Sequence, residues 1–237
     1  MTTDFEYSGT ELDSLADARN YYRAILDRFV PWLGGDVVEV GAGIGTFAER
    51  LIEHAPPRSL TLIEPGAGNA KRLAARFAGD ACVRSLAGYL EDHVAGLQAD
   101  AVVMVNVPEH VQDDRALFAN ARQALRPGGH LLLFVPALPW LFGSLDEAFG
   151  HYRRYTRPRL RAALEDAGLE PVRMHYMNVV GVIPWFIAGR IARRRTLHPA
   201  DVRIYDRFVT PIVSRIERIV TPPFGQSILA VARRAHG

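Results

Sequence analysis

Apolar residues recur along the chain in two patterns that alternate, one typical of strands and the other of helices. Short runs dense in valine, isoleucine and leucine occupy residues 37–40, 60–63, 101–105 and 130–135. Between them, apolar residues spaced three or four apart mark residues 14–29, 69–77 and 114–125, a spacing that predicts amphipathic helices. Strands that are apolar almost throughout and alternate with helices form parallel sheets covered on both faces. The sequence therefore predicts an α/β doubly wound sheet.

Polar residues indicate where the helices begin. Ser14 with Asp17, and Thr46 with Glu49, have the spacing of a capping box. Further helices are predicted to begin at Asn69 and, with Pro158 in the opening turn, at Thr156; Asp113 and Asp114 are interpreted as another helix start.

The last third of the chain has a different pattern. Residues 171–177 and 227–231 are predicted strands, and residues 181–195 and 200–220 are helical stretches rich in large apolar side chains. In the second stretch an apolar residue recurs every fourth position, which predicts a face to bury, and Pro184 and Pro211 are expected to bend or interrupt these helices. The expected order is a helical cap (1–34), a core (35–177), a helical lid (178–225) and a final strand (226–237), all in a single domain.

Composition narrows the class of protein. Hydrophobic residues make up 49% and charged residues 23% of 237 residues, which is typical of a folded globular chain. The 28 basic and 26 acidic residues give a net charge of +2, so no nucleic-acid partner is expected. The single cysteine, Cys82, excludes an intramolecular disulfide and a cysteine-based zinc site, and we expect it in the core of a cytoplasmic protein. Residues 1–7 lack the order of a secretory signal.

A glycine loop, Gly41-Ala42-Gly43-Ile44-Gly45, follows the first predicted strand and precedes a helix. Ligands of open α/β sheets bind at this edge, where glycines let the backbone approach them; the alternative is a plain tight turn. Glu64 ends the next strand, nineteen residues after Gly45, where a carboxylate can accept hydrogen bonds from an adenosine ribose; the alternative is a solvated side chain. A dinucleotide fingerprint needs glycine at position 46, where this chain has threonine, which weighs against NAD.

Three segments together carry a family resemblance. Residues 38–46 (VEVGAGIGT), 63–65 (IEP) and 106–111 (NVPEHV) resemble, in order and spacing, the main motifs of class I S-adenosylmethionine (SAM)-dependent methyltransferases, in the branch that acts on small molecules. The resemblance covers about residues 15–175. It implies a Rossmann-like seven-stranded, mostly parallel sheet whose last strand is antiparallel, with SAM as the cofactor and S-adenosylhomocysteine as its product.

The resemblance also implies a set of cofactor-binding positions. Glu39 and the loop surround the methionine part of SAM, and Glu64, followed by Pro65, takes the ribose. The family often has an acidic residue on the adenine side, where this chain has Ser85 and Leu86. The full implied set is Tyr21, Glu39, Gly41, Ala42, Gly43, Glu64, Pro65, Ser85, Leu86, Asn106 and Val107.

Two histidines are candidate catalytic residues because histidine titrates near neutral pH. His110 lies in the third motif, where Pro108 replaces the usual leucine, and it is either catalytic or structural. His151 lies in residues 150–155, which either reach the acceptor or form a loop in which an arginine pairs with Asp146 or Glu147. Candidate acceptor-binding residues are Tyr22, Tyr152, Arg154, Tyr155 and Trp185. No metal site is expected.

The pattern therefore predicts transfer of a methyl group to a small lipophilic acceptor, with residues 178–225 as a lid. Two alternatives for the lid stay open, plain core packing and transient contact of its apolar residues and Arg190, Arg193, Arg194 and Arg195 with an anionic membrane surface. The alternative functions are a tRNA or DNA methyltransferase and a non-catalytic protein that binds SAM or NAD. The sequence does not predict an oligomeric state.

Overall fold

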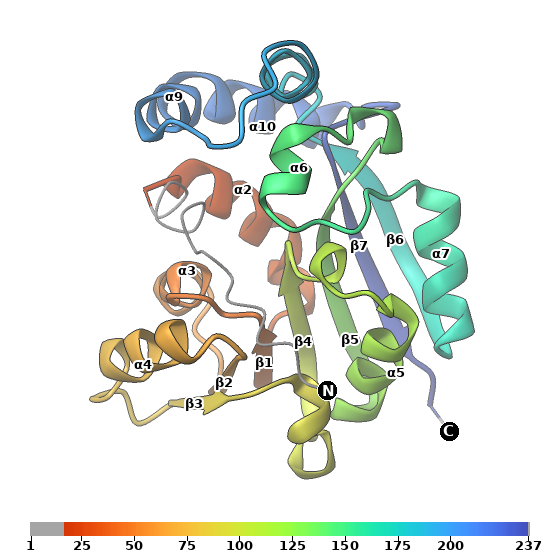
Figure 1. Cartoon of the computed structure of the whole chain (residues 1–237). Coiled ribbons are helices and arrows are strands. Elements are labelled where there is room, and N and C mark those ends of the chain that lie inside the picture. The colour runs from red at the N-terminus through yellow and green to blue at the C-terminus, as the bar shows by residue number, and fades with distance from the viewer. Residues whose placement is uncertain (1–16, 237) are drawn as a thin grey trace.

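The computed structural model describes residues 17–236, and its strands form a seven-stranded sheet in the order β3-β2-β1-β4-β5-β7-β6 (Figure 1). Strands β1 to β6 run parallel and β7 is antiparallel to both of its neighbours, as the resemblance implied. The strands are β1 (Asp36–Val40), β2 (Ser59–Glu64), β3 (Val83–Ala87), β4 (Ala99–Val105), β5 (Leu125–Pro136), β6 (Leu169–Met177) and β7 (Ser227–Arg234).

Helices cover both faces of the sheet, which confirms the doubly wound class. Phe29, Leu51 and Leu73 bring α2, α3 and α4 against one face, whereas Phe118 and Leu164 bring α5 and α7 against the other. Each set belongs to a separate cluster of buried apolar side chains. The helices are α2 (Arg19–Phe29), α3 (Thr46–His54), α4 (Ala67–Arg76), α5 (Asp114–Ala124), α6 (Ser144–Ala148) and α7 (Arg157–Asp166).

Helix starts follow the expected caps in some places and glycines in others. Thr156 accepts a hydrogen bond from the backbone of Arg159 at 3.3 Å, as predicted. The expected box of Thr46 is wrong: Gly45, at φ 83°, is the N-cap of α3 and Thr46 is already helical, because the glycine loop enters the helix through a left-handed turn. Asn69 likewise lies inside α4, which starts after Gly66.

Two further expectations need comment. Cys82 is exposed rather than buried, because it lies in the loop that enters the edge strand β3. Ser14 of the first expected capping box lies outside the described residues, and the N-cap of α2 is Ala18.

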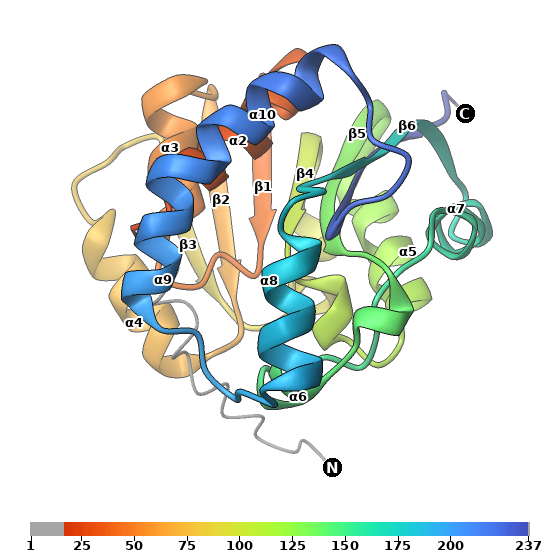
Figure 2. The same ribbon diagram turned by 90° about the horizontal axis from the view of Figure 1, so that it is seen from above.

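Residues 178–225 form the helical lid, which lies across the top of the sheet in Figure 1 and faces the viewer in Figure 2. One arm consists of α8 (Val182–Phe186) and a π-helical turn (Ile187–Ile191). The other consists of α9 (Pro199–Ile204), a π turn (Tyr205–Val209) and α10 (Thr210–Ile219). No helix in residues 17–236 is long and apolar enough to cross a membrane.

The apolar face expected to be buried on the second arm is instead exposed. Ile204, Phe208, Ile212 and Ile216 are each more than half exposed. The arm turns Val213 and two carboxylates, Asp206 and Glu217, toward the core instead. Hydrogen bonds that these carboxylates make with the core outweigh the apolar pattern in setting the orientation of the arm.

Both carboxylates accept backbone N–H groups of the core. Asp206 binds the amide nitrogens of Asn20 at 3.1 Å and Tyr21 at 2.8 Å, at the start of α2, whose own N-cap offers no side-chain acceptor. Glu217 binds the amides of Asn178 at 3.0 Å and Val179 at 2.9 Å, just after β6. The lid is thus fastened at two places by charge-assisted hydrogen bonds.

Replacement Asp206→Ala should lower the free energy of unfolding by about 2 kcal/mol, because two amides at a helix start lose a charged acceptor. Urea denaturation measures the change. Asp201→Ala is the matched control on the same arm. Among residues 17–236 the side chain of Asp201 makes only an exposed ion pair with Arg194, so this replacement should cost under about 1 kcal/mol. Equal losses for the two variants would contradict the anchoring role.

Candidate functional site

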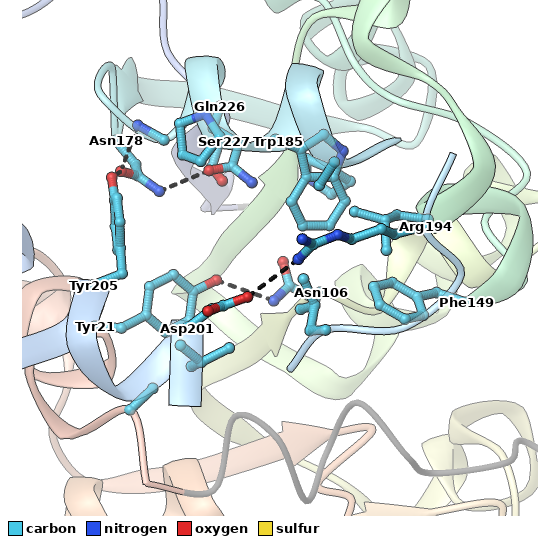
Figure 3. A pocket seen from close by; sticks show the side chains of 18 of the residues that line it. Tyr21, Asn106, Phe149, Asn178, Trp185, Arg194, Asp201, Tyr205, Gln226 and Ser227 are labelled. Carbon is cyan, nitrogen blue, oxygen red and sulfur yellow. Dashed lines mark hydrogen bonds and ion pairs between the residues drawn. The ribbon is translucent and has the colours of Figure 1, made fainter. Parts of the chain in front are cut away.

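A cavity of about 460 Å³ lies between the lid and the carboxyl ends of the central strands. Asn106 after β4, Pro136 at the end of β5 and Asn178 after β6 form part of its floor, and Tyr21 of α2 forms part of its wall (Figure 3). Trp185 is among the residues that the lid contributes. The lid therefore roofs the edge of the sheet at which ligands of such folds bind.

The glycine loop runs close to the end of β4. Gly41 has φ 70°, and a Cβ atom there would lie 2.5 Å from Cγ2 of Val107. Only glycine fits this position, for both conformation and space. The loop is further fixed by the amide of Gly43, which donates to Oε2 of Glu64 at 2.8 Å.

Glu64 is buried at the end of β2, so the solvated alternative is wrong. Its second oxygen, Oε1, accepts the amide of Gly66 at 2.9 Å. The carboxylate therefore joins the loop after β1 to the loop after β2. Carboxylate oxygens have further lone pairs, so Glu64 can accept additional hydrogen bonds from a ligand.

Glu39 is a buried carboxyl group two residues before the loop. Its Oε2 atom has no hydrogen-bond partner in residues 17–236. Desolvation by burial, assisted by the charge of Glu64, raises the pKa of Glu39 to about 8. A group of this kind favours a cation beside it, which would stabilise the ionised form.

Asn106 and Tyr21 connect the two halves of the site. Asn106 has a left-handed backbone, φ 53°, and its side-chain amide donates to the hydroxyl of Tyr21 at 3.2 Å (Figure 3). The Tyr21 ring also makes an edge contact with Phe134 of β5. Pro65 is exposed, and Ser85 and Leu86 lie inside β3, where they pair with residues of β2.

On the other side of the cavity, one buried carboxylate holds three side chains. Oδ1 of Asp146 binds Nδ1 of His151 at 2.9 Å and Nε of Arg154 at 2.7 Å. Oδ2 accepts the indole N–H of Trp185 at 3.4 Å, and the guanidinium of Arg154 stacks over that indole at 4.8 Å. Burial alone would raise the pKa of Asp146, but the bond with His151 and the charge of Arg154 hold it below its usual value.

The expected pairing of Arg154 with Asp146 is confirmed. The same arginine also forms part of the cavity wall. Both His151 and Arg154 line the cavity together with Trp185. Arg153 makes a different pair, with Asp114 at 2.9 Å.

His110 lies behind His151, with ring centroids 4.7 Å apart. Burial, and then the neighbouring His151, lower the pKa of His110 to about 3, so its imidazole is neutral at neutral pH. Glu109, His110 and His151 offer ligand atoms within 4.8 Å of one another. The guanidinium of Arg154 interacts electrostatically with Glu109, which disfavours a cation there, and the absence of a metal stays a prediction.

Three tyrosines expected near the acceptor do not line the cavity. Tyr155 is fully buried and donates to Asp114 at 2.9 Å, while Tyr152 is 53% exposed. Tyr22 packs edge-on against Phe47, because its neighbour Tyr21 occupies the side of α2 that faces the cavity.

Other lining residues were missed in the sequence. Tyr205 of the lid donates to Oδ1 of Asn178 at 2.7 Å, and the side-chain amide of Asn178 donates to Gln226 at 2.8 Å (Figure 3). Asn178 has φ 59° directly after β6, so a polar residue at a strand end was the available signal. No comparable local signal marks Tyr205, which reaches the site only through the path of the lid.

Comparison with known proteins identifies the family of this chain. A methyltransferase domain model matches residues 14–174, so the chain belongs to this methyltransferase family. An uncharacterized methyltransferase of Mycobacterium tuberculosis is 30% identical over 135 residues, which are 56% of this chain and 67% of that protein.

Solved structures share the fold at low identity. A methyltransferase in complex with the Haloferax volcanii Trm112 methyltransferase activator aligns over 100% of both chains, with TM-score 0.66 and 15% identity. Geranyl diphosphate methyltransferase in complex with SAM aligns over 98% of this chain and 93% of its own, with TM-score 0.63 and 19% identity. These structures show the fold, whereas the family match identifies the chain as a SAM-dependent methyltransferase.

Replacement Glu39→Gln should change how stability depends on pH. The pKa of Glu39 rises from 4.5 to about 8 on folding, so its carboxyl group favours the folded state most below pH 4.5 and loses that contribution as pH rises toward 8. The stability of the wild type relative to Glu39→Gln should fall over this interval, by up to about 1.4 kcal/mol per pH unit. Urea denaturation across the interval, with exposed Glu165→Gln as control, measures it. Parallel curves for wild type and Glu39→Gln would contradict the assignment.

Proposed function

We propose that this methyltransferase binds SAM between the glycine loop and the ends of β2 and β4, and methylates a small lipophilic acceptor held under the lid. One observation carries the proposal: a single cavity joins Tyr21 and Asn106, whose neighbour Val107 lies against Gly41 of the loop, to His151, Arg154 and Trp185 beneath the lid. The donor and the acceptor would therefore meet in a space that the lid covers in part, which limits the access of water.

The residues around the loop fit SAM chemically. SAM carries a cationic ammonium group and a sulfonium, and bound there it supplies a methyl group already activated for transfer. Glu39, with its buried oxygen lacking a hydrogen-bond partner in the described chain, complements such a cation. Gly41 leaves the space that a side chain would fill, and Glu64 can accept the ribose hydroxyls.

On the acceptor side, His151 is the candidate base. The ionised Asp146 accepts the proton on Nδ1, which leaves Nε2 of His151 as the acceptor of a proton. A proton must leave only when the acceptor is an alcohol, phenol or acidic carbon, because a neutral amine can attack first. The neutral His110 behind His151 adds no positive charge of its own next to this base at neutral pH.

A lipophilic acceptor suits the walls of the cavity. Trp185, Phe149 and Leu145 are among the apolar lining residues, and Arg154 lies stacked against Trp185. The similar fold of geranyl diphosphate methyltransferase also supports a lipophilic acceptor, since that protein acts on an isoprenoid. A nucleic-acid substrate would need a groove open to a polymer, whereas this cavity is roofed by the lid.

Incubation with SAM that carries a trideuterated methyl group tests the proposal directly. Purified protein is mixed with either a lipid extract or total tRNA and DNA, and the products are analysed by mass spectrometry. Label should enter a lipid-soluble small molecule. Label found in nucleic acid alone, or in neither mixture, would overturn the proposed acceptor class.

Replacement Glu64→Ala should weaken SAM binding by about 1.5 to 3 kcal/mol, the value of hydrogen bonds to a charged group. Isothermal titration calorimetry measures this, and the exposed Glu91→Ala serves as control. If the wild type binds NAD and not SAM, the cofactor assignment is wrong.

Replacement His151→Ala should lower turnover of the labelled methyl group by about 100-fold if the acceptor must lose a proton, while SAM affinity stays near that of the wild type. His54→Ala, on the exposed end of α3, should leave both unchanged. Loss of folding or of SAM binding in His151→Ala would instead support a structural role in the Asp146 network.

A further inference from the structure

The outer face of the lid carries a set of large apolar side chains that the described part of the chain, residues 17–236, leaves uncovered. They lie four residues apart on both arms, and each is about half exposed or more. We call them the lid stripes: Ile183, Ile187 and Ile191 on the first arm, and Ile204, Phe208, Ile212 and Ile216 on the second. Exposed apolar surfaces of this kind mark sites of interaction with a protein or a membrane.

The π-helical turns help to keep each stripe on one face. In an α-helix a step of four residues turns about 400°, so a four-residue repeat drifts by about 40° per step. A π-helical turn holds more residues per turn, so it rotates the stripe back. Residues 187–191 and 205–209 form such turns within the two stripes.

The stripes are bordered by positive charge. Residues 178–225 contain eight arginines and three acidic residues, whereas the remainder of the chain contains 20 basic and 23 acidic residues. Two of the acidic residues, Asp206 and Glu217, are buried in the anchors, and Asp201 pairs with Arg194. Arg203, Arg207 and Arg215 are exposed and make no ion pair within residues 17–236.

We propose that the lid stripes dock onto the surface of an anionic lipid bilayer. Apolar side chains would enter the boundary between headgroups and acyl chains, and the arginines beside them would contact lipid phosphates, as in interfacial amphipathic helices. A second copy of the chain fits less well, because a two-fold interface would bring the two arginine-rich faces together.

Docking would bring the acceptor site to the lipid. Trp185, Ala188 and Tyr205 line the cavity from the inner side of the same two arms, and Ile187 of the first stripe, which is 49% exposed, also borders the cavity. The cavity roof would then lie against the bilayer, so that a lipophilic acceptor need not cross water. This last step rests on the proposed function, whereas docking itself does not.

Vesicle co-sedimentation of the full chain tests the proposal. The protein should sediment with vesicles of equimolar phosphatidylcholine and phosphatidylglycerol, and stay in solution with phosphatidylcholine alone. The double variant Ile212→Ser/Ile216→Ser should bind the mixed vesicles at least tenfold more weakly. Its control is Val30→Ser/Val172→Ser, since these valines are 43% and 51% exposed outside the lid.

A second pair of variants tests the charge. Arg203→Gln/Arg215→Gln should also lose at least tenfold in vesicle affinity, whereas Arg84→Gln/Arg161→Gln, outside the lid, should not. All variants should keep wild-type SAM affinity by calorimetry, which shows that they are folded.

Three outcomes would overturn the docking proposal. They are no sedimentation of the wild type with mixed vesicles, equal binding to neutral vesicles, and a dimer in size-exclusion chromatography that the isoleucine variants dissociate. Wild-type protein that binds SAM but not vesicles would contradict the docking proposal and leave the proposed function unaffected. Vesicle binding without methyl transfer to any lipid would contradict the proposed acceptor class and leave the docking proposal unaffected.

Discussion

The hydrogen bonds of Asp206 and Glu217 hold the second arm of the lid over the cavity. These two carboxylates reach from the lid to backbone amides about 185 and 39 residues away along the chain. Their burial is favourable only with those amides in place, since an uncompensated buried charge is costly. They therefore specify one orientation of the second lid arm, and that orientation sends its isoleucines outward and places Tyr205 over the cavity.

The surroundings of the buried carboxyl groups differ between the glycine loop and the cavity under the lid. At the glycine loop, the charge of Glu64 adds to burial in disfavouring ionisation of Glu39, and the described residues offer Glu39 no countercharge. Under the lid, Asp146 is surrounded by donors from His151, Arg154 and Trp185. Because Trp185 belongs to the lid and His151 to the core, this shared carboxylate couples the position of the roof to the orientation of the candidate base.

Local patterns were enough to predict the doubly wound sheet, whereas its antiparallel last strand followed only from the family resemblance. Strand and helix periodicity, together with the loop around Gly41 and the strand-end Glu64, depend on interactions between residues near in sequence or at a fixed edge of the sheet. Other features depend on contacts between distant segments. The cap of α3 followed the glycine turn at Gly45 rather than Thr46, and Tyr155 entered the core because Asp114 offered its hydroxyl a buried partner. Apolar spacing could not predict which face of the second lid arm is buried, because the hydrogen bonds of Asp206 and Glu217 determine its orientation.

The π turn at residues 205–209 also has a consequence for how this family can vary in length. It holds one more residue than an α-helical turn, so deletion of a single residue there would restore a regular α-helix and rotate α10 by about 100° relative to α9. Glu217 would leave its amides and the stripe on α10 would separate from that on α9. Homologues that keep both lid surfaces should therefore preserve the number of residues between Asp206 and Glu217, even where the side chains between them diverge.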